Sequence, residues 1–337
     1  MTAPLSHSIH SDFPQLSVTY CNFQDAWRFH KTLHFFELDV NQLSAGRFLG
    51  SILEVATPHL QLDRHFHNSQ LKLAGSPTKS WSFGIPINPL NLLFDYRYQL
   101  LENYLLLAPP QSSFTLTCQP PYELYVIYFS EDYFVSICEK YHLPDPAKLL
   151  GEVYHQPSVI SLAPPDQQQF KWALGTLFDR QLTSLWGQSL DSPLFPFSAM
   201  GIIDHIEERI VVQIINVLAK SRQIQPKKIV AKRMSHLYQA EEFIRAYAKA
   251  QISIMDISHA VGISQRTLEY LFKDFYGISP CAYLKCFRLN QLRQSLHHCN
   301  LSGNTINHLA AEWGFWHSGQ LAKDYFNLFG ELPSQTN

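Results

Sequence analysis

Two copies of one short helical unit, within residues 253–329, constrain this 337-residue chain more than any other feature. Each copy has an apolar-periodic segment, a glycine, a polar residue and a second apolar-periodic segment. The first copy turns at Gly262 and restarts at Ser264, and the second turns at Gly314. This pattern is typical of the helix-turn-helix, in which a tight turn joins two crossed helices. Two such units in tandem predict a chain that contacts DNA at two places.

Capping patterns place the helices of the first unit. Ser253 with Asp256 three residues on has the pattern of a capping box, and Ser264 is a second N-cap. The helix 264–275 is expected to end at Gly277. Its expected core face is formed by Leu268, Leu271, Phe272 and Phe275.

A long helix is predicted between the two units. Ser279 and Pro280 have the pattern of an N-cap and a first helical residue, and the helix should run to about His297, which gives roughly 25 Å. Such a rod is long enough to hold two recognition helices about one DNA turn, roughly 34 Å, apart. A further helix is expected at 237–250, with Thr305 capping the second unit. The helix 317–328 should bury Leu321, Tyr325, Leu328 and Phe329.

Side chains outside these core faces are the candidate DNA contacts. Arg266 can pair with a guanine, Gln265 with an adenine, and Glu269 can accept a hydrogen bond from a cytosine. The second unit offers fewer such groups, so we expect it mainly to dock on phosphates while the first unit reads bases. The predicted DNA-binding residues are Ser264, Gln265, Arg266, Glu269, Tyr270, Lys273, His317, Ser318, Gln320 and Lys323.

The charge is unevenly distributed along the chain, although the net charge is only −2. Residues 220–337 carry 14 Lys and Arg against 8 Asp and Glu, which favours contact of this part with phosphate. Residues 236–337 alone hold eight of each sign, because six of the basic residues lie in 220–233. Residues 222–235 are therefore expected to be a basic interdomain linker, with a secondary phosphate contact as the alternative.

Residues 46–130 have the pattern of a β domain. Short runs rich in aromatic and β-branched residues are separated by turn patterns such as Pro109-Pro110, which predicts a sandwich or a small barrel. The predicted strands are 59–67, 81–85, 104–107, 113–118 and 122–129, and the helices that follow are 131–141, 165–185 and 202–220.

Apolar residues of 202–220 recur at spacings of three and four and form one stripe. The stripe contains Ile203, Ile206, Ile210, Ile214, Ile215 and Leu218. It either packs on the β domain or forms a homodimer interface through 202–220, and both can hold.

Histidines and aromatic residues are the other candidates for a site in the β domain. His65 and His67 share one face of a strand, but no carboxylate follows at a helpful spacing, so we expect no metal and no cofactor. Aromatic residues are expected in the barrel core and rim, or some of them line a ligand pocket whose ligand residues stay unknown. They are Trp81, Phe83, Tyr96, Tyr98, Tyr104, Tyr122, Tyr125 and Tyr128.

Several classes of protein are not expected. The chain has no G-x-S-x-G motif, P-loop or dinucleotide fingerprint, so we expect no enzyme. It has no apolar run of 18 residues and no secretory signal at its N-terminus, so we expect no membrane span. The six cysteines are scattered, which favours reduced thiols in a cytoplasmic protein.

Residues 237–335 resemble the tandem helix-turn-helix domain of AraC/XylS-type transcription regulators. The segments that match are 256–258, 262–268, 272–280, 283–285, 288–290, 309–310, 314–315, 329–330 and 333–334. The segment 313–317 with 329–334 is most similar to a subgroup that includes ethanolamine-utilisation regulators. The sequence departs from the family at Ser258, at the segment 316–319, and at Asn337, which leaves the expected final helix short or missing.

The resemblance implies a two-domain α+β protein. Residues 1–185 would form a cupin-like β-barrel or sandwich with flanking helices that binds an effector of unknown identity, 186–221 a helical segment suited to dimerisation, and 236–337 the all-α DNA-binding domain. Family members are usually activators that bind promoter DNA and contact RNA polymerase. The alternative is a cupin-type enzyme or small-molecule-binding protein whose helical tail does not bind DNA.

Overall fold

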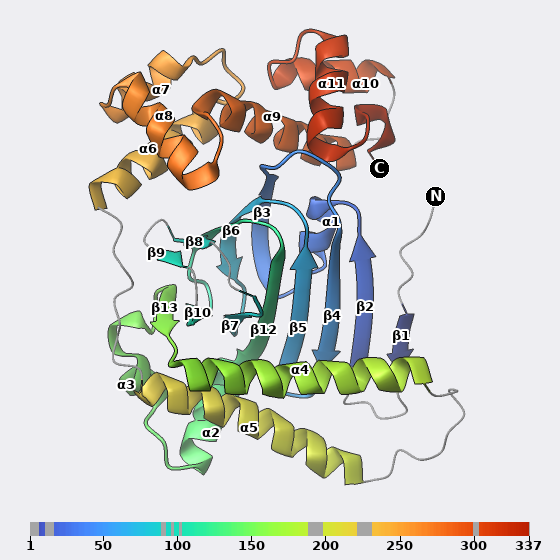
Figure 1. The fold of residues 1–337 in the computed structure, drawn as a ribbon, viewed down its shortest axis with the longest axis vertical. Helices are drawn as coiled ribbons and strands as arrows, with labels where there is room; N and C mark the ends of the chain where they lie inside the picture. Colours follow the sequence, from blue (N-terminus) through green and yellow to red (C-terminus); the bar gives the residue numbers. More distant parts are fainter. Residues whose placement is uncertain are drawn as a thin grey trace.

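A β-rich domain with flanking helices is followed by an all-α domain. In this computed structural model the described residues are 7–10, 17–88, 92–95, 98–100, 103–187, 198–220, 231–298 and 303–336. Figure 1 shows the helices of the all-α domain across one end of the strands, and two long helices of the β-rich domain across the opposite end.

Two antiparallel sheets form the β-rich domain. The larger has the strand order β1-β2-β4-β5-β12-β7-β10-β13, and the smaller has the order β3-β6-β11-β8-β9. The strands of the larger sheet are β1 (His7–His10), β2 (Ser17–Phe23), β4 (Gly50–Ala56), β5 (Leu60–His67), β7 (Ser80–Pro86), β10 (Tyr104–Ala108), β12 (Tyr122–Ser130) and β13 (Ser158–Ser161). Those of the smaller sheet are β3 (Phe36–Gln42), β6 (Leu71–Pro77), β8 (Leu92–Phe94), β9 (Tyr98–Leu100) and β11 (Phe114–Cys118).

The predicted strands are confirmed, but the predicted range 46–130 is too narrow. Strands β1, β2 and β3 precede it, and β13 follows it. Strand β2 reads SVTYCNF and has mostly half-buried or exposed side chains, so its sequence lacks the apolar run that marks a central strand.

The central strands β7 and β12 of the larger sheet are buried on both faces. Along β7, Trp81 and Phe83 point to one hydrophobic cluster, while Ser82 and Gly84 line the space between the two sheets. Along β12, Ile127 and Val126 divide between the two faces in the same way. A strand with two apolar environments has a near-continuous apolar sequence, as in YELYVIYFS of β12.

Helices cover the outer face of the larger sheet. They include α2 (Glu131–Lys140), α3 (Pro146–Leu150), α4 (Pro164–Gly187) and α5 (Ser198–Lys220). The described apolar residues of α5, Ile210, Ile214, Ile215 and Leu218, are buried in the same cluster as Trp81 and Phe83. The packing interpretation of this stripe is therefore confirmed for these four residues, whereas the side chains of Ile203 and Ile206 lie outside the described residues.

The predicted aromatic residues divide between the two faces. Trp81, Phe83 and Tyr125 pack toward the helices, and Tyr104, Tyr122 and Tyr128 pack between the sheets. Tyr96 and the side chain of Tyr98 lie outside the described residues. His65 and His67 are both buried and share one face of β5, as predicted. Within the described part of the chain, no group of three or more His, Cys, Asp or Glu residues is placed to hold a metal ion.

The all-α domain has six α-helices among its described residues. They are α6 (Ala231–Tyr247), α7 (Ile254–Val261), α8 (Gln265–Tyr276), α9 (Pro280–His297), α10 (Gly303–Glu312) and α11 (Ser318–Phe329), followed by the short 3-10 helix η2 (Pro333–Gln335). None of the helices in the described residues is long and apolar enough to span a membrane.

The starts of α6 and α10 differ from the sequence predictions. The prediction that the first helix begins at Leu237 is wrong: α6 begins at Ala231, inside the predicted linker 222–235, because Met234 and Leu237 are both buried against the helical core. Residues 221–230 of that linker lie outside the described residues. Helix α10 begins at Gly303, so Thr305 lies within its first turn rather than at its cap.

The core face of α8 also differs in one residue. Leu268, Leu271 and Phe272 are buried as predicted, but Phe275 is half-buried and Tyr276 is buried in its place. The Tyr276 ring stacks on Tyr283 with 5.0 Å between ring centroids, and its hydroxyl donates a hydrogen bond to Glu241. Contacts with α6 and α9 therefore select the buried side chain, which helical spacing alone could not do.

The two domains meet through a buried polar interface. The Gln42 backbone N–H donates to Asn290 Oδ1 (2.9 Å), and Asn290 Nδ2 donates to the Gln42 carbonyl (2.9 Å). The Lys72 ammonium of β6 pairs with Glu241 of α6 and donates to the Tyr283 hydroxyl. Leu43 joins the hydrophobic cluster of the helical domain, so apolar packing accompanies these contacts.

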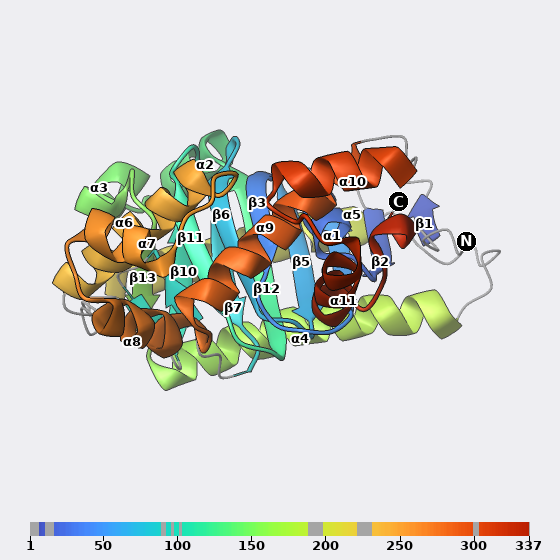
Figure 2. The same cartoon turned by 90° about the horizontal axis from the view of Figure 1, so that it is seen from above.

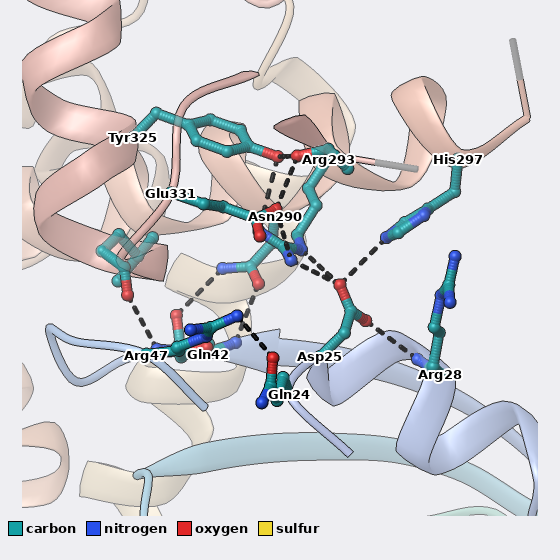
Figure 3. A network of polar contacts seen from close by, with 12 residues as sticks. Gln24, Asp25, Arg28, Gln42, Arg47, Asn290, Arg293, His297, Tyr325 and Glu331 are labelled. Atoms are coloured by element: carbon teal, nitrogen blue, oxygen red, sulfur yellow. Dashed lines mark hydrogen bonds and ion pairs between the residues drawn. The ribbon is translucent and has the colours of Figure 1, made fainter. Parts of the chain in front are cut away.

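A second group of interdomain contacts surrounds Asp25, which caps α1 (Ala26–Lys31). We call Asp25, Arg293, His297 and Glu331 the Asp25 cluster. Arg293 Nε donates to Asp25 Oδ2 (2.8 Å), His297 Nε2 lies 3.1 Å from the same oxygen, and Arg293 also pairs with Glu331 (2.9 Å). Figure 3 shows Asp25 between α1 and these side chains of the helical domain. The cluster thus joins the β-rich domain to α9.

Ionic contacts control the protonation state of Asp25. Burial would raise the pKa of this carboxyl, but the hydrogen bond from His297 and the charge of Arg293 hold its pKa well below the usual range. Asp25 therefore stabilises the fold fully above its unfolded-state pKa of about 3.9, and this stabilisation is lost as the pH falls below that value.

Replacing Asp25→Asn is expected to lower the free energy of unfolding at pH 7 by about 3 kcal/mol, because it leaves the buried Arg293 guanidinium with less compensating charge. Urea unfolding at pH 7 and at about pH 3 measures this difference, which should shrink at the lower pH. The control is Asp274→Asn, which removes an exposed ion pair with Arg233 and should cost no more than about 1 kcal/mol. A difference for Asp25→Asn that is independent of pH would contradict the ionic role of Asp25.

Candidate nucleic-acid interface

The first helix-turn-helix is held by its caps. Ser253 and Asp256 form the predicted capping box of α7, and Gly262 ends that helix with a φ of 72°, in the left-handed region that favours glycine. The Ser264 hydroxyl then accepts the Thr267 backbone N–H (3.1 Å) and begins α8. These short-range contacts set the angle between the two helices.

The exposed face of α8 carries most of the predicted base-reading residues. Gln265, Arg266 and Lys273 are exposed, Tyr270 is 57% exposed, and Glu269 is half-buried. Arg266 donates a hydrogen bond to the Tyr270 hydroxyl (3.1 Å), and its guanidinium lies 5.5 Å from the centre of the Tyr270 ring. The tyrosine thus orients the arginine along the outer face of the helix.

Ser264 has a structural role that the sequence prediction did not separate from DNA contact. Its hydroxyl oxygen accepts the Thr267 N–H, and it lies 2.9 Å from the Thr267 hydroxyl. The hydroxyl is therefore already committed to the cap of α8, although the residue is exposed.

The second unit presents a smaller exposed polar set. His317 is the N-cap residue of α11, but its side chain makes no capping hydrogen bond, and Ser318, Gln320 and Lys323 are exposed. The buried face of α11 is the predicted one: Leu321, Tyr325, Leu328 and Phe329.

An exposed tryptophan beside α11 was not among the predicted contacts. Trp316 precedes the helix and is 67% exposed. A large apolar side chain at this position offers a surface for apolar contact with a thymine methyl group. Its presence in an otherwise polar turn was visible in the sequence, but only its exposure shows that it is not part of the core.

Helix α9 connects the two units into one body. Its first half packs with α6, α7 and α8, and its second half with α10 and α11, while Cys286 and Trp313 contact both hydrophobic clusters. Arg288 Nε and Nη2 donate to the carbonyls of Ala248 (2.8 Å) and Ala250 (2.7 Å), which fixes the end of α6 on α9. Figure 2 shows α8 toward one end of α9 and α11 toward the other.

Ion pairing explains how a domain without net charge can present positive charge. Lys249 pairs with Glu312 and Lys285 with Asp324, and Arg293 is buried in the Asp25 cluster. On the two exposed helices the basic residues are Arg266, Lys273 and Lys323, and none of them forms an ion pair with a described residue. These three cations are therefore available to phosphate.

Comparisons with known proteins agree with this arrangement. A helix-turn-helix domain family matches residues 257–337. The chain is 33% identical over 95 residues to the XylDLEGF operon transcriptional activator 1 of Pseudomonas putida, a match that covers 28% of this chain and 29% of that protein. The C-terminal domain is an AraC/XylS-type helix-turn-helix domain.

A second operon regulator and a solved structure are also similar to this chain. The chain is 29% identical over 96 residues to the probable thc operon regulatory protein of Rhodococcus erythropolis, covering 28% of this chain and 29% of that protein. The AraC-like transcriptional activator CuxR is a similar solved structure, with 13% identity, a TM-score of 0.41, and coverage of 86% of this chain and 94% of CuxR. The chain thus matches less than a third of the length of the XylDLEGF activator and of the thc operon regulatory protein.

Replacing Ser264→Ala in the AraC-type domain is expected to lower its free energy of unfolding by about 1 kcal/mol, because the cap of α8 is lost. Urea unfolding of the full chain, followed by circular dichroism, measures the effect. Ser318→Ala is the matched control, since Ser318 is exposed at the first position of α11 and should change stability by less than about 0.5 kcal/mol. Equal effects of the two substitutions would show that the Ser264 cap is unimportant.

Proposed function

We propose that the chain is a sequence-specific DNA-binding transcription regulator, and that it activates transcription in response to a small-molecule effector. The main support is the exposed face of α8, where Gln265, Arg266 and Lys273 extend from a helix capped at both ends. Two of the similar proteins are named as an operon activator and an operon regulatory protein, which supports the same role here.

In this proposal α8 and α11 enter two successive major grooves on one face of the duplex. Helix α9 joins the two units and has 18 residues, or about 27 Å. This length is close to the roughly 34 Å between successive major grooves once the width of the flanking helices is added. A single chain would then contact two grooves without a second copy.

The two units divide the work of recognition. Gln265, Arg266 and Glu269 of α8 read base edges, because they carry the amide, guanidinium and carboxylate groups that distinguish base pairs. Ser318 and Lys323 of α11 contact phosphates, and Trp316 adds an apolar contact. RNA polymerase is the partner through which a bound activator of this family would act.

The β-rich domain receives the effector in this proposal. It has a partly open cavity of about 60 Å³ between its two sheets, lined mostly by apolar side chains and by His30, His65, Ser82 and Tyr122. A mostly apolar cavity with a few polar groups is typical of a small-molecule site. The interdomain contacts give this domain a physical connection to the AraC-type domain.

Arg266→Ala is expected to weaken binding to a specific operator by about 1–3 kcal/mol and to relax the preference at one base pair, since a bidentate contact with guanine is lost. Both effects are measured by gel-shift titration at two salt concentrations. The DNA is a library of sequence variants of the region upstream of the gene that encodes this chain. Lys323→Ala should weaken binding to all sequences alike and lower the salt dependence by about one phosphate contact.

The control for these two variants is Lys79→Ala, which removes an exposed cation of the β-rich domain and should leave the binding profile unchanged. An Arg266→Ala protein with the wild-type base preference would rule out the proposed base contact. A wild-type chain that binds DNA without sequence preference and without salt dependence would rule out the proposed function.

A further inference from the structure

Helix α1 separates the cavity of the β-rich domain from the interdomain interface. Phe29, His30 and the nearby Leu33 line the cavity. Asp25, the N-cap of the same helix, is the centre of the Asp25 cluster, and Trp27 stacks on His297 of α9 with 4.6 Å between ring centroids. Figure 1 shows α1 between the strands and the helical domain. One short helix thus contacts both the cavity and the DNA-binding part of the chain.

His30 is the polar group of α1 that faces the cavity. It is buried, and neither of its ring nitrogens has a hydrogen-bond partner among the described residues. Burial and the neighbouring His67 and His65 hold the pKa of His30 well below its ordinary value, so its ring is neutral at pH 7. The neutral ring offers one donor and one acceptor, and burial without a partner is unfavourable for both.

The remaining walls of the cavity are strands held by hydrogen bonds to their neighbours. His65, Ser82 and Val126 come from the paired strands β5, β7 and β12, which form the centre of the larger sheet. Helix α1 has only six residues and is not part of either sheet. The cavity has a volume of about 60 Å³, well below the usual 300–1,000 Å³ of ligand pockets, so a ligand of several heavy atoms that enters it fully requires a wall to move. Among the described walls, α1 is the element that no sheet hydrogen bonds hold in place.

We propose that a small, mostly apolar, uncharged molecule with one hydrogen-bonding group binds in this cavity against His30, displaces α1, and thereby weakens the Asp25 cluster. This inference rests on the effector response proposed above and adds the class of ligand and the route of the response. The apolar lining disfavours a permanently charged ligand, because burial of an unpaired charge is costly. Displacement of α1 moves Asp25 and Trp27 away from Arg293 and His297 and releases α9 from the β-rich domain.

The test uses the full chain without DNA and three aromatic probes at millimolar concentration: phenol, toluene and benzenesulfonate. Phenol should raise the melting temperature most, toluene less, and benzenesulfonate not at all, because a ligand that binds only the folded chain stabilises it. Hydrogen exchange should become faster with phenol in peptides that contain α1 and the last two turns of α9. Exchange in α7 and α8 should not change.

Two pairs of variants separate binding from coupling. His30→Phe keeps the bulk of the side chain but removes the hydrogen bond, so the affinity for phenol should fall about 3- to 10-fold while that for toluene is kept. His34→Phe, at an exposed histidine outside the cavity, is its control. Asp25→Asn should give fast exchange in α9 without a probe and no further increase with phenol. The control is Asp324→Asn, which removes the ion pair between Asp324 of α11 and Lys285 of α9. It should leave the phenol response intact.

Failure of phenol to bind, or equal binding of benzenesulfonate, would overturn the ligand class. Binding of phenol with unchanged exchange in α9 would overturn the coupling. The comparison of phenol with toluene in the wild-type chain tests the hydrogen bond even where His30→Phe does not fold. A normal phenol response in a chain that fails the gel-shift experiment would count against the proposed function alone, since no DNA is present here.

Discussion

The burial of Arg293 is the interaction on which the arrangement of the two domains depends. Its guanidinium is 7% exposed and is compensated by Asp25 of the β-rich domain, by Glu331 after α11, and by the rings of Phe329 and Tyr325. A buried guanidinium is costly unless charges and hydrogen bonds surround it. Its partners come from two separate parts of the chain, the start of α1 and residues 325–331, so satisfying this one charge requires both parts to meet α9.

The same requirement affects how charge is used for DNA contact. A count of basic residues in 220–337 includes Arg293 and Arg288 as possible phosphate contacts. In the structure Arg293 is buried, and Arg288 donates to backbone carbonyls just after α6. The exposed positive charge of the two reading helices comes from Arg266, Lys273 and Lys323. The position of these three cations on exposed helix faces, rather than the net charge of the domain, therefore supports the proposed interface.

The interdomain contacts are the physical basis of the proposed influence of the β-rich domain on DNA binding. Asp25 caps α1, while His30 on the same helix faces the cavity. Helix α1 therefore has ionic contacts at its N-terminal end and, on its inner face, a side chain without a hydrogen bond to any described residue. One position of the helix need not satisfy both. In the proposed mechanism, a ligand that bonds His30 displaces α1, and the contacts of Asp25 are weakened as a result.

Local sequence patterns determined the helix-turn-helix units. Ser253, Ser264 and Gly262 act within four residues of the helix ends that they define, so the caps of α7 and α8 and the long α9 could be predicted. The resemblance to AraC/XylS-type domains also rests on short local segments, such as 262–268 and 272–280. The apolar periodicity of α8 also predicts which of its side chains are exposed, although their contacts with DNA stay a prediction.

Only the tertiary structure decided the second burial face of the larger sheet, the start of α6 at Ala231, the exposure of Trp316 and the position of the cavity. Each depends on residues far apart in the chain, as Gln42 and Asn290 show with a separation of 248 residues. Capping and periodicity act over one or two helical turns and carry no information on such pairs. The interdomain interface was therefore out of reach of the sequence, because which distant groups meet is set by packing and by the need to satisfy every buried charge.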